Sequence, residues 1–175
     1  MLIKTVFAGF GGQGVLLIAR NLAQAAMVEG KNVTYFPSYG PEVRGGTANC
    51  TVAISDEEIA SPVASSPDFV VVMNEPSLVR FQNQVQSGGV LFVNSSLSNT
   101  EISRGDIEVV KIPASEIAEK MGNPKSANLV ILGALVKKSN LVSLNTVVGS
   151  LGGILNKKKL LAAAEKALRA GYELI

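Results

Sequence analysis

The sequence predicts an α/β protein with a doubly wound, mainly parallel sheet and helices on both of its faces. Short apolar runs of strand length alternate with helical segments, which is the order expected of parallel strands joined by crossovers. A glycine-rich turn joins the first run to the first helix. Hydrophobic residues make up 47% of the 175 residues, enough for one well-buried core. We therefore expect a single domain over residues 1–175.

The first half of the chain contains the first helix and most of the expected strands. Residues 2–8 form a β-rich run that ends at a glycine, which suits a buried first strand. Residues 15–29 are expected to form a helix that stops at Gly30. This helix is apolar on more than one face, as is typical of a helix buried on several sides. The other expected strands here are residues 32–36, 47–54 and 68–73.

The second half of the chain continues the alternation. Two further apolar runs are expected to be strands, at residues 89–94 and 108–112. The expected helices are residues 76–84, 114–121, 126–138 and 159–170. The last helix carries an apolar face made of Leu160, Ala164, Ala167 and Leu168, which predicts that it packs on the body of the protein.

Composition excludes several classes of function. A net charge of +2 without a basic stripe is no nucleic-acid signature. The chain has no histidine, which excludes Ser-His-Asp triads, Cys-His dyads and histidine zinc sites. The single cysteine, Cys50, excludes an intrachain disulfide and an iron–sulfur cluster held by cysteines of this chain alone. Buried inside an expected strand, Cys50 is expected to be inert.

The beginning of the chain has some features of a signal peptide, namely Lys4, an apolar stretch and Ala23-Gln24-Ala25. Four glycines and Arg20 interrupt that stretch. No segment approaches the roughly 20 apolar residues that a membrane span needs. We expect a soluble, cytoplasmic protein.

The first glycine loop satisfies G-x-G-x-x-G between a strand and a helix, as in Rossmann-like folds. Its glycines would permit a tight turn, a close approach of the backbone to a phosphate, and close helix–strand packing. The helix N-terminus that follows favours an anion. A loop that merely packs the helix is an equal alternative. The candidate ligand contacts are Gly9, Gly11, Gly12, Gln13 and Gly14.

A nicotinamide cofactor is disfavoured by the residues that follow the second strand. Dinucleotide sites place Asp or Glu about 20 residues after the loop, to hold the ribose. Thr34, Tyr35, Phe36 and Pro37 occupy that place here, and no arginine is available for a 2′-phosphate.

A second glycine-rich segment, residues 38–49, follows the second expected strand. In a doubly wound sheet it would lie at the same carboxyl edge as the first loop. Gly40-Pro41 forces a turn, and Arg44 offers a planar cation suited to carboxylate or phosphate. Pairing of Arg44 with Glu42 or with a neighbouring subunit is the alternative. The candidate contacts here are Ser38, Tyr39, Gly40, Glu42, Arg44, Gly45 and Gly46.

The two segments together resemble the gamma subunit, or gamma domain, of 2-oxoacid:ferredoxin oxidoreductases. The likeness is carried by residues 9–15 (Gly-Phe-Gly-Gly-Gln-Gly-Val) and 38–50 (Ser-Tyr-Gly-Pro-Glu-Val-Arg-Gly-Gly-Thr-Ala-Asn-Cys). Residues 61–62, 67–68, 74 and 128–135 also fit the family's pattern. Neither glycine motif is specific alone, but the pair at this spacing is, and the resemblance covers essentially the whole chain.

The resemblance implies an oxidative decarboxylation in which a 2-oxoacid, coenzyme A and oxidised ferredoxin give an acyl-CoA, carbon dioxide and reduced ferredoxin. It implies a non-catalytic subunit that contributes to coenzyme A binding and packs against catalytic subunits. Thiamine diphosphate and iron–sulfur clusters then belong to partner subunits. Residues 42–49 look most like the 2-oxoglutarate members, since pyruvate members tend to carry a second arginine before the glycine. A homodimer within the assembly is an open alternative.

Other assignments stay open. Asn74 ends the fourth expected strand, where its amide would bind a cofactor or cap the next helix. Lys157–Lys159 would face solvent or an acidic partner. Two competing functions also remain, a stand-alone NAD(P)-dependent oxidoreductase and a pure assembly module that binds no small molecule. Titration with coenzyme A and with NADH separates all three.

Overall fold

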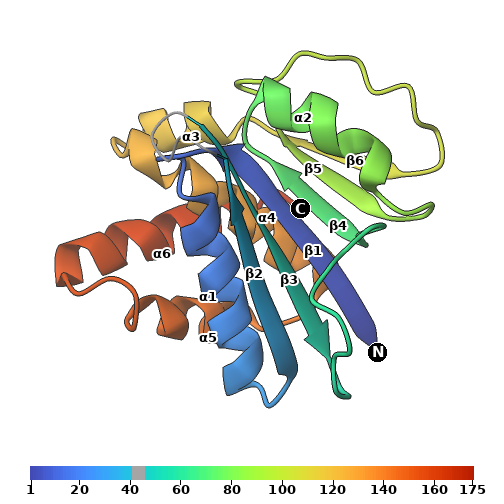
Figure 1. Cartoon of the computed structure of the whole chain (residues 1–175). Helices are drawn as coiled ribbons and strands as arrows, with labels where there is room; N and C mark the ends of the chain where they lie inside the picture. The colour runs from blue at the N-terminus through green and yellow to red at the C-terminus, as the bar shows by residue number, and fades with distance from the viewer. Residues whose placement is uncertain (41–45) are drawn as a thin grey trace.

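The computed structural model describes residues 1–40 and 46–175. A six-stranded sheet forms its centre, in the order β2-β3-β1-β4-β5-β6 (Figure 1). Every expected strand is present, and residues 108–112 have the predicted bounds. The strands are β1 (Leu2–Phe10), β2 (Asn32–Tyr39), β3 (Thr47–Ser55), β4 (Phe69–Val72), β5 (Val90–Asn94) and β6 (Glu108–Ile112).

The sheet is mainly parallel, as predicted, with one strand running against the rest. β1, β4, β5 and β6 pair in parallel, whereas β3 is antiparallel to both β1 and β2. The alternation of strands and helices in the sequence gives no sign of this reversal. β2 and β3 follow each other with a short connection, and only antiparallel neighbours can be joined without a long crossover.

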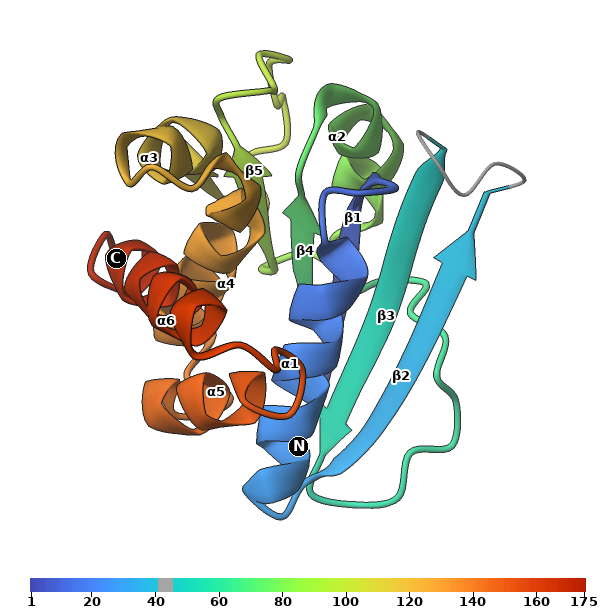
Figure 2. The same cartoon turned by 90° about the vertical axis from the view of Figure 1, so that its left-hand side faces the viewer.

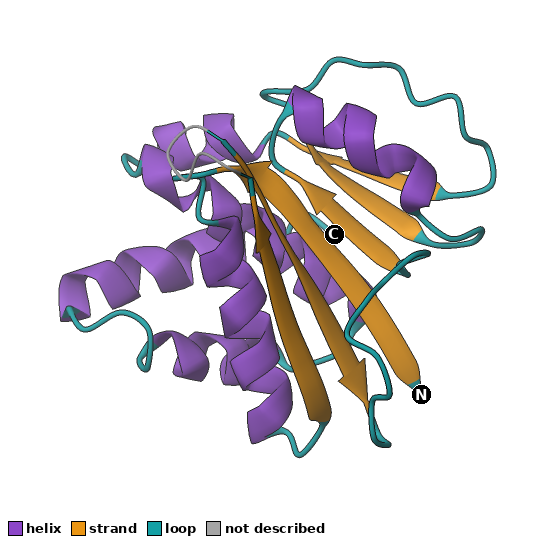
Figure 3. Cartoon of the chain, viewed as in Figure 1, coloured by secondary structure: helices purple, strands orange, loops and turns teal. Residues whose placement is uncertain are grey.

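Helices cover both faces of the sheet, which confirms the predicted α/β layering (Figure 3). α1 and α4 pack on one face, with α5 and α6 outside them, and α2 covers the other face. The helices are α1 (Val15–Val28), α2 (Glu75–Phe81), α3 (Ala114–Lys120), α4 (Ala127–Ser139), α5 (Leu144–Leu151) and α6 (Lys158–Tyr172). Short 3-10 turns follow α2 (Gln82–Gln84) and precede α4 (Pro124–Ser126).

Helix α5 has no counterpart among the predicted elements. It is short, and only Val147 and Leu151 of its residues are buried. Its N-terminus is nevertheless capped by Ser143, whose Oγ accepts a hydrogen bond from the N–H of Thr146 at 3.1 Å. The capping serine therefore marks the start of this helix in the sequence. The apolar pattern that follows is too short to predict a helix.

Two apolar clusters sandwich the sheet. The larger lies between the sheet and α1, α4 and α6, with Phe7, Ile18 and Phe92 fully buried. The smaller lies under α2 and includes Leu78 and Leu91. Cys50 is buried in the larger cluster, as expected.

Helices α4 and α6 cross at very short range. Gly133 of α4 and Gly171 of α6 face each other's backbone across the crossing. An ideal Cβ at Gly171 would lie 1.7 Å from the carbonyl oxygen of Val130. Only glycine permits this separation, because any side chain would overlap backbone atoms of the opposite helix.

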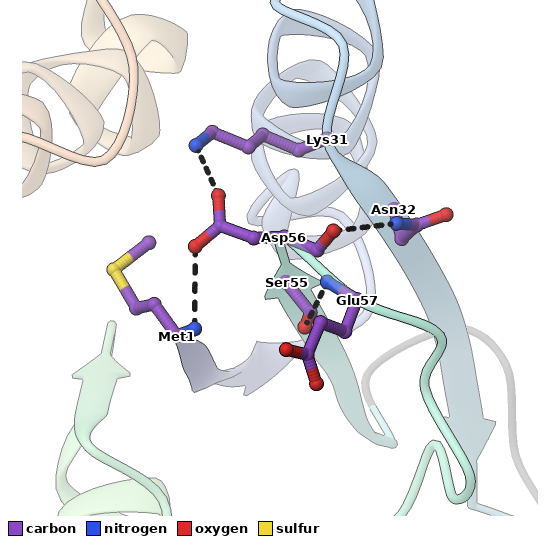
Figure 4. Close-up of polar contacts among 6 residues, drawn as sticks. All are labelled: Met1, Lys31, Asn32, Ser55, Asp56 and Glu57. Atoms are coloured by element: carbon purple, nitrogen blue, oxygen red, sulfur yellow. Dashed lines mark hydrogen bonds and ion pairs between the residues drawn. The ribbon is translucent and has the colours of Figure 1, made fainter.

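Polar contacts tie together the edge of the sheet where β1 begins and β3 ends (Figure 4). Asp56 accepts a hydrogen bond from Lys31 Nζ at 2.6 Å and lies 3.2 Å from the amino group of Met1. Its carbonyl oxygen accepts a hydrogen bond from Asn32. The hydrogen bond from Lys31 is the main reason why the pKa of Asp56 is lowered. The candidate site lies at the opposite end of these strands, where β1 ends and the loop to α1 begins.

None of the helices in the described ranges combines the length and the apolar character needed to cross a membrane.

Candidate functional site

The two glycine-rich segments meet at the carboxyl edge of β1, as predicted. β1 ends at Phe10, and the loop then enters α1 at Val15 (Figure 2, top). The N–H of Gly11 donates a hydrogen bond to the carbonyl oxygen of Gly46 at 2.9 Å. Gly40 closes the other end of the second segment by donating to the carbonyl oxygen of Thr47 at 2.9 Å. Two segments that are distant in the sequence thus form one surface.

Three positions of the first loop require glycine, each for a different structural reason. At Gly9 a Cβ would lie 2.7 Å from the side-chain oxygen of Gln13, so the tight turn leaves no room for it. Gly12 has φ +100° with open space beside it, so its backbone conformation alone favours glycine. Gly14 has φ +73°, and a Cβ there would lie 2.3 Å from the amide nitrogen of Asn128. That nitrogen donates to the Gly14 carbonyl at 3.1 Å and joins α4 to the loop.

Gln13 and Asn74 are bound to each other inside the site. Gln13 Oε1 accepts hydrogen bonds from Phe10 N–H and from Asn74 Nδ2, both at 2.7 Å. Its Nε2 donates to the carbonyl oxygen of Met73 at 3.3 Å. Asn74 Oδ1 caps α2 by accepting from Ser77 N–H at 2.9 Å. The two amides therefore hold the loop against β4, and the capping alternative for Asn74 is the one the geometry shows.

A cavity of about 230 Å³ lies between the two glycine segments. Its described lining carries no charged side chain. Aromatic and aliphatic groups form the walls, and glycine backbone forms one side. The lining residues are Phe10, Gly11, Gly12, Gly14, Val15, Leu16, Tyr39 and Ala48.

The second segment is divided between two faces of the sheet. Tyr39 lies opposite Ala48 and lines the cavity, whereas Ser38 lies opposite Asn49. Alternate residues of a strand point to opposite faces, so the Ser38 side chain points away from the cavity. The predicted contacts Glu42, Arg44 and Gly45 lie outside the described residues.

The start of α1 makes the cavity attractive to an anion. Its N-cap is Gly14, which offers no side-chain cap, and its first turn has no acidic residue. The first N–H groups of a helix lack intrahelical acceptors, and the helix dipole adds a partial positive charge there. The geometry suits a phosphate or carboxylate.

Neither Tyr35 nor Cys50, which lie near this edge, is poised for acid–base or nucleophilic chemistry. Burial raises the pKa of the Cys50 thiol to about 12. Burial, together with the neighbouring Cys50, also raises the pKa of Tyr35 to about 12. Both groups stay protonated at neutral pH, which suits a binding role for this edge.

The strand order also bears on the nicotinamide alternative. The neighbour of β1 on the hairpin side is the antiparallel β3, and the end of β2 lies one strand further out. A ribose-binding acid after β2 would therefore stand two strands from the glycine loop, instead of beside it as in dinucleotide sites.

Sequence reasoning missed a second cavity, which lies on the other side of the glycine loop and has a volume of about 270 Å³. Lys125 is the charged residue of its lining. The signal in the sequence was a lysine directly after Pro124, since proline at such a position marks the start of a helix. The lining residues are Gly12, Gln13, Met73, Leu97, Ser115, Pro124, Lys125 and Ala127.

Comparison with known proteins identifies relatives over nearly the whole chain. The sequence profile of the pyruvate ferredoxin/flavodoxin oxidoreductase family matches residues 4–174. Ketoisovalerate oxidoreductase subunit VorA of Methanothermobacter thermautotrophicus is 43% identical over 77% of this chain. The match spans only 28% of that protein's length. 2-Oxoglutarate synthase subunit KorC of Methanocaldococcus jannaschii is 35% identical, over 95% of this chain and 90% of KorC.

Solved structures show the same fold. The gamma subunit of a keto/oxoacid ferredoxin oxidoreductase from Geobacter sulfurreducens superposes with a TM-score of 0.85 at 28% identity, over 98% of this chain and 96% of that one. The 2-oxoglutarate:ferredoxin oxidoreductase of Magnetococcus marinus, solved with 2-oxoglutarate, coenzyme A and succinyl-CoA, gives a TM-score of 0.90 at 24% identity. That match covers 99% of this chain and 31% of the other.

Proposed function

The chain belongs to the pyruvate ferredoxin/flavodoxin oxidoreductase family, and from that premise we propose that it is the gamma subunit of a 2-oxoacid:ferredoxin oxidoreductase. In the complex it contributes to the binding of coenzyme A and to assembly. Partner subunits carry thiamine diphosphate and the iron–sulfur clusters, and pass electrons to ferredoxin. We place this complex in the cytoplasm. The family resemblance of the two glycine segments and the similarity to KorC over nearly its whole length support this proposal.

The observation that carries the coenzyme A part is the cavity between the two glycine segments. Coenzyme A combines phosphates with a flat aromatic adenine ring, whose faces can stack on apolar side chains. Backbone N–H groups at the start of α1 suit a phosphate, and Tyr39 with Phe10 and Leu16 offers apolar surface for the ring. Among the described residues of the lining there is no carboxylate that would repel the phosphates.

We propose 2-oxoglutarate as the substrate, because KorC matches the chain over nearly the whole length of both proteins. The higher identity to VorA makes ketoisovalerate the second candidate, although that match covers less of the chain. The substrate's reacting end would contact the thiamine-bearing subunit, so only an assay of the complex separates the two.

The first experiment is anaerobic purification of the tagged chain from its native host. We expect thiamine-binding and iron–sulfur subunits to co-purify, with coenzyme A-dependent reduction of a dye by 2-oxoglutarate. Ketoisovalerate and pyruvate serve as the comparison substrates. A chain that purifies alone, with no activity on any of the three, would overturn the proposal.

The second experiment tests the cavity itself. Tyr39→Ala should weaken coenzyme A binding to the complex by about tenfold, because aromatic stacking on a base contributes about 1–3 kcal/mol. Phe36→Ala is the matched control, since Phe36 is an exposed aromatic of the same strand that points to the opposite face. Isothermal titration calorimetry measures both. Equal affinities for Tyr39→Ala and the native complex would remove the first cavity from the coenzyme A site.

A further inference from the structure

The second cavity occupies the position where α/β sheets bind ligands. β1 and β4 are parallel neighbours. The helix after β1 packs on one face of the sheet, and the helix after β4 packs on the other. Where the connections of two neighbouring strands diverge in this way, a crevice opens outside their carboxyl ends. Gly12 after β1 and Met73 after β4 line the cavity, so it lies at this crevice.

The described lining of the cavity carries a positive charge and no acidic residue that would compensate it. Lys125 is the single charged residue among the described members of the lining, and the ion pairs of the described residues do not include it. Lys125 lies two residues before the first residue of α4, Ala127, and the first turn of α4 has no acidic residue and no side-chain cap. A cation at that end opposes the helix dipole and is unfavourable in the free chain. An anion in the cavity would turn both positive charges into stabilising contacts.

Ser115 adds a hydrogen-bond donor to the same lining. Its Oγ accepts a hydrogen bond from Asn94 Nδ2 at 3.0 Å. Asn94 is fully buried and also donates to the carbonyl oxygen of Met73, so it is held in place. Because Asn94 supplies the hydrogen in that contact, the Ser115 hydroxyl keeps its own, and the described residues provide no acceptor for it. An ammonium and a hydroxyl make a donor set for an anionic oxygen.

We propose that Lys125 and Ser115 bind a phosphate group of coenzyme A. Gly12 lines both cavities, so one extended ligand can cross the glycine loop and reach from the apolar first cavity to the charged second one. The proposal rests on the coenzyme A function proposed above and adds the residues that neutralise the ligand's charge. It also gives a reason for a lysine that has no ion pair among the described residues and lies just before α4.

The test compares lysines in the purified complex. Lys125→Gln should weaken coenzyme A binding, measured by calorimetry, about tenfold or more, as expected for the loss of a charge-assisted hydrogen bond. The KM for coenzyme A should rise in parallel while kcat is retained. Lys120→Gln is the control, because Lys120 is an exposed lysine at the end of α3 that lines neither cavity. Lys125→Arg should retain most of the affinity.

Dephospho-coenzyme A identifies which phosphate is bound. If Lys125 binds the 3′-phosphate, native and Lys125→Gln complexes will bind dephospho-coenzyme A equally. If it binds the diphosphate, the roughly tenfold difference will persist; both results support the proposal. An unchanged affinity for coenzyme A in Lys125→Gln overturns it. If only Tyr39→Ala then binds coenzyme A more weakly, the proposed coenzyme A function is still supported. If neither variant binds coenzyme A more weakly, that function is contradicted too.

Discussion

Replacing Gly133 with alanine should destabilise the protein, although alanine is the better helix former. Gly133 lies in the middle of α4, where α6 crosses. An alanine Cβ there would lie 2.0 Å from the carbonyl oxygen of Leu168 and 2.8 Å from the amide nitrogen of Tyr172. Both obstacles are backbone atoms, so no side-chain rotation can relieve the overlap. The helices must separate or α6 must shift.

The size of the effect follows from this geometry. Ordinary contact begins at 3.4 Å, so the carbonyl must retreat by 3.4 Å less 2.0 Å, or about 1.4 Å. Overpacking a core costs about 1–3 kcal/mol, and a backbone clash in a helix pair belongs at the upper end. The higher helix propensity of alanine offsets about 1 kcal/mol of this loss of stability. We expect a net loss of about 2 kcal/mol, which lowers Tm by about 4–8 °C for a chain of this length.

Thermal unfolding followed by circular dichroism measures this difference. Gly149→Ala is the matched control, because Gly149 is an exposed helical glycine of α5 at which a Cβ would meet nothing within 4 Å. The same substitution should there raise stability by about 0.5–1 kcal/mol. Opposite signs at the two positions would confirm the close crossing of α4 and α6. A Gly133→Ala variant as stable as the native protein would refute it.

Two further predictions depend on protonation. Cys50 should resist thiol reagents at about pH 8 in the folded protein, because its pKa of about 12 leaves roughly one thiolate in ten thousand; fast labelling without denaturant would contradict its burial. Asp106→Asn should lower Tm near pH 7, and by less near pH 3. The hydrogen bonds from Arg104 hold the pKa of Asp106 below its ordinary value. Such a group stabilises the fold above its unfolded pKa, and that contribution disappears as the pH falls through the folded pKa. An equal loss at both pH values would show that the ion pair is not responsible.

Local pattern alone was sufficient for the class of fold and for the place of the first cavity. The apolar runs and glycine stops depend on residues close together in the chain, so strands and the long helices lie near their predicted bounds. The meeting of the first glycine loop with Gly46 of the second segment also followed from the sequence, since both segments come after strands that end at one edge. The hydrogen bond between Gly11 and Gly46 confirms that inference.

Only the tertiary structure decided how distant segments pair and what they enclose. β3 lies antiparallel beside β1, and the hydrophobic periodicity of the sequence does not indicate which strands become neighbours. Gln13 stays a predicted ligand contact, and the structure adds that its side-chain oxygen accepts a hydrogen bond from Asn74, 61 residues away. Lys125 lines the second cavity because α4 begins against the glycine loop. Packing between elements determines the strand order, the partners of buried amides and the residues that line the cavities. These contacts join residues that are far apart in the sequence, so local patterns do not reveal them.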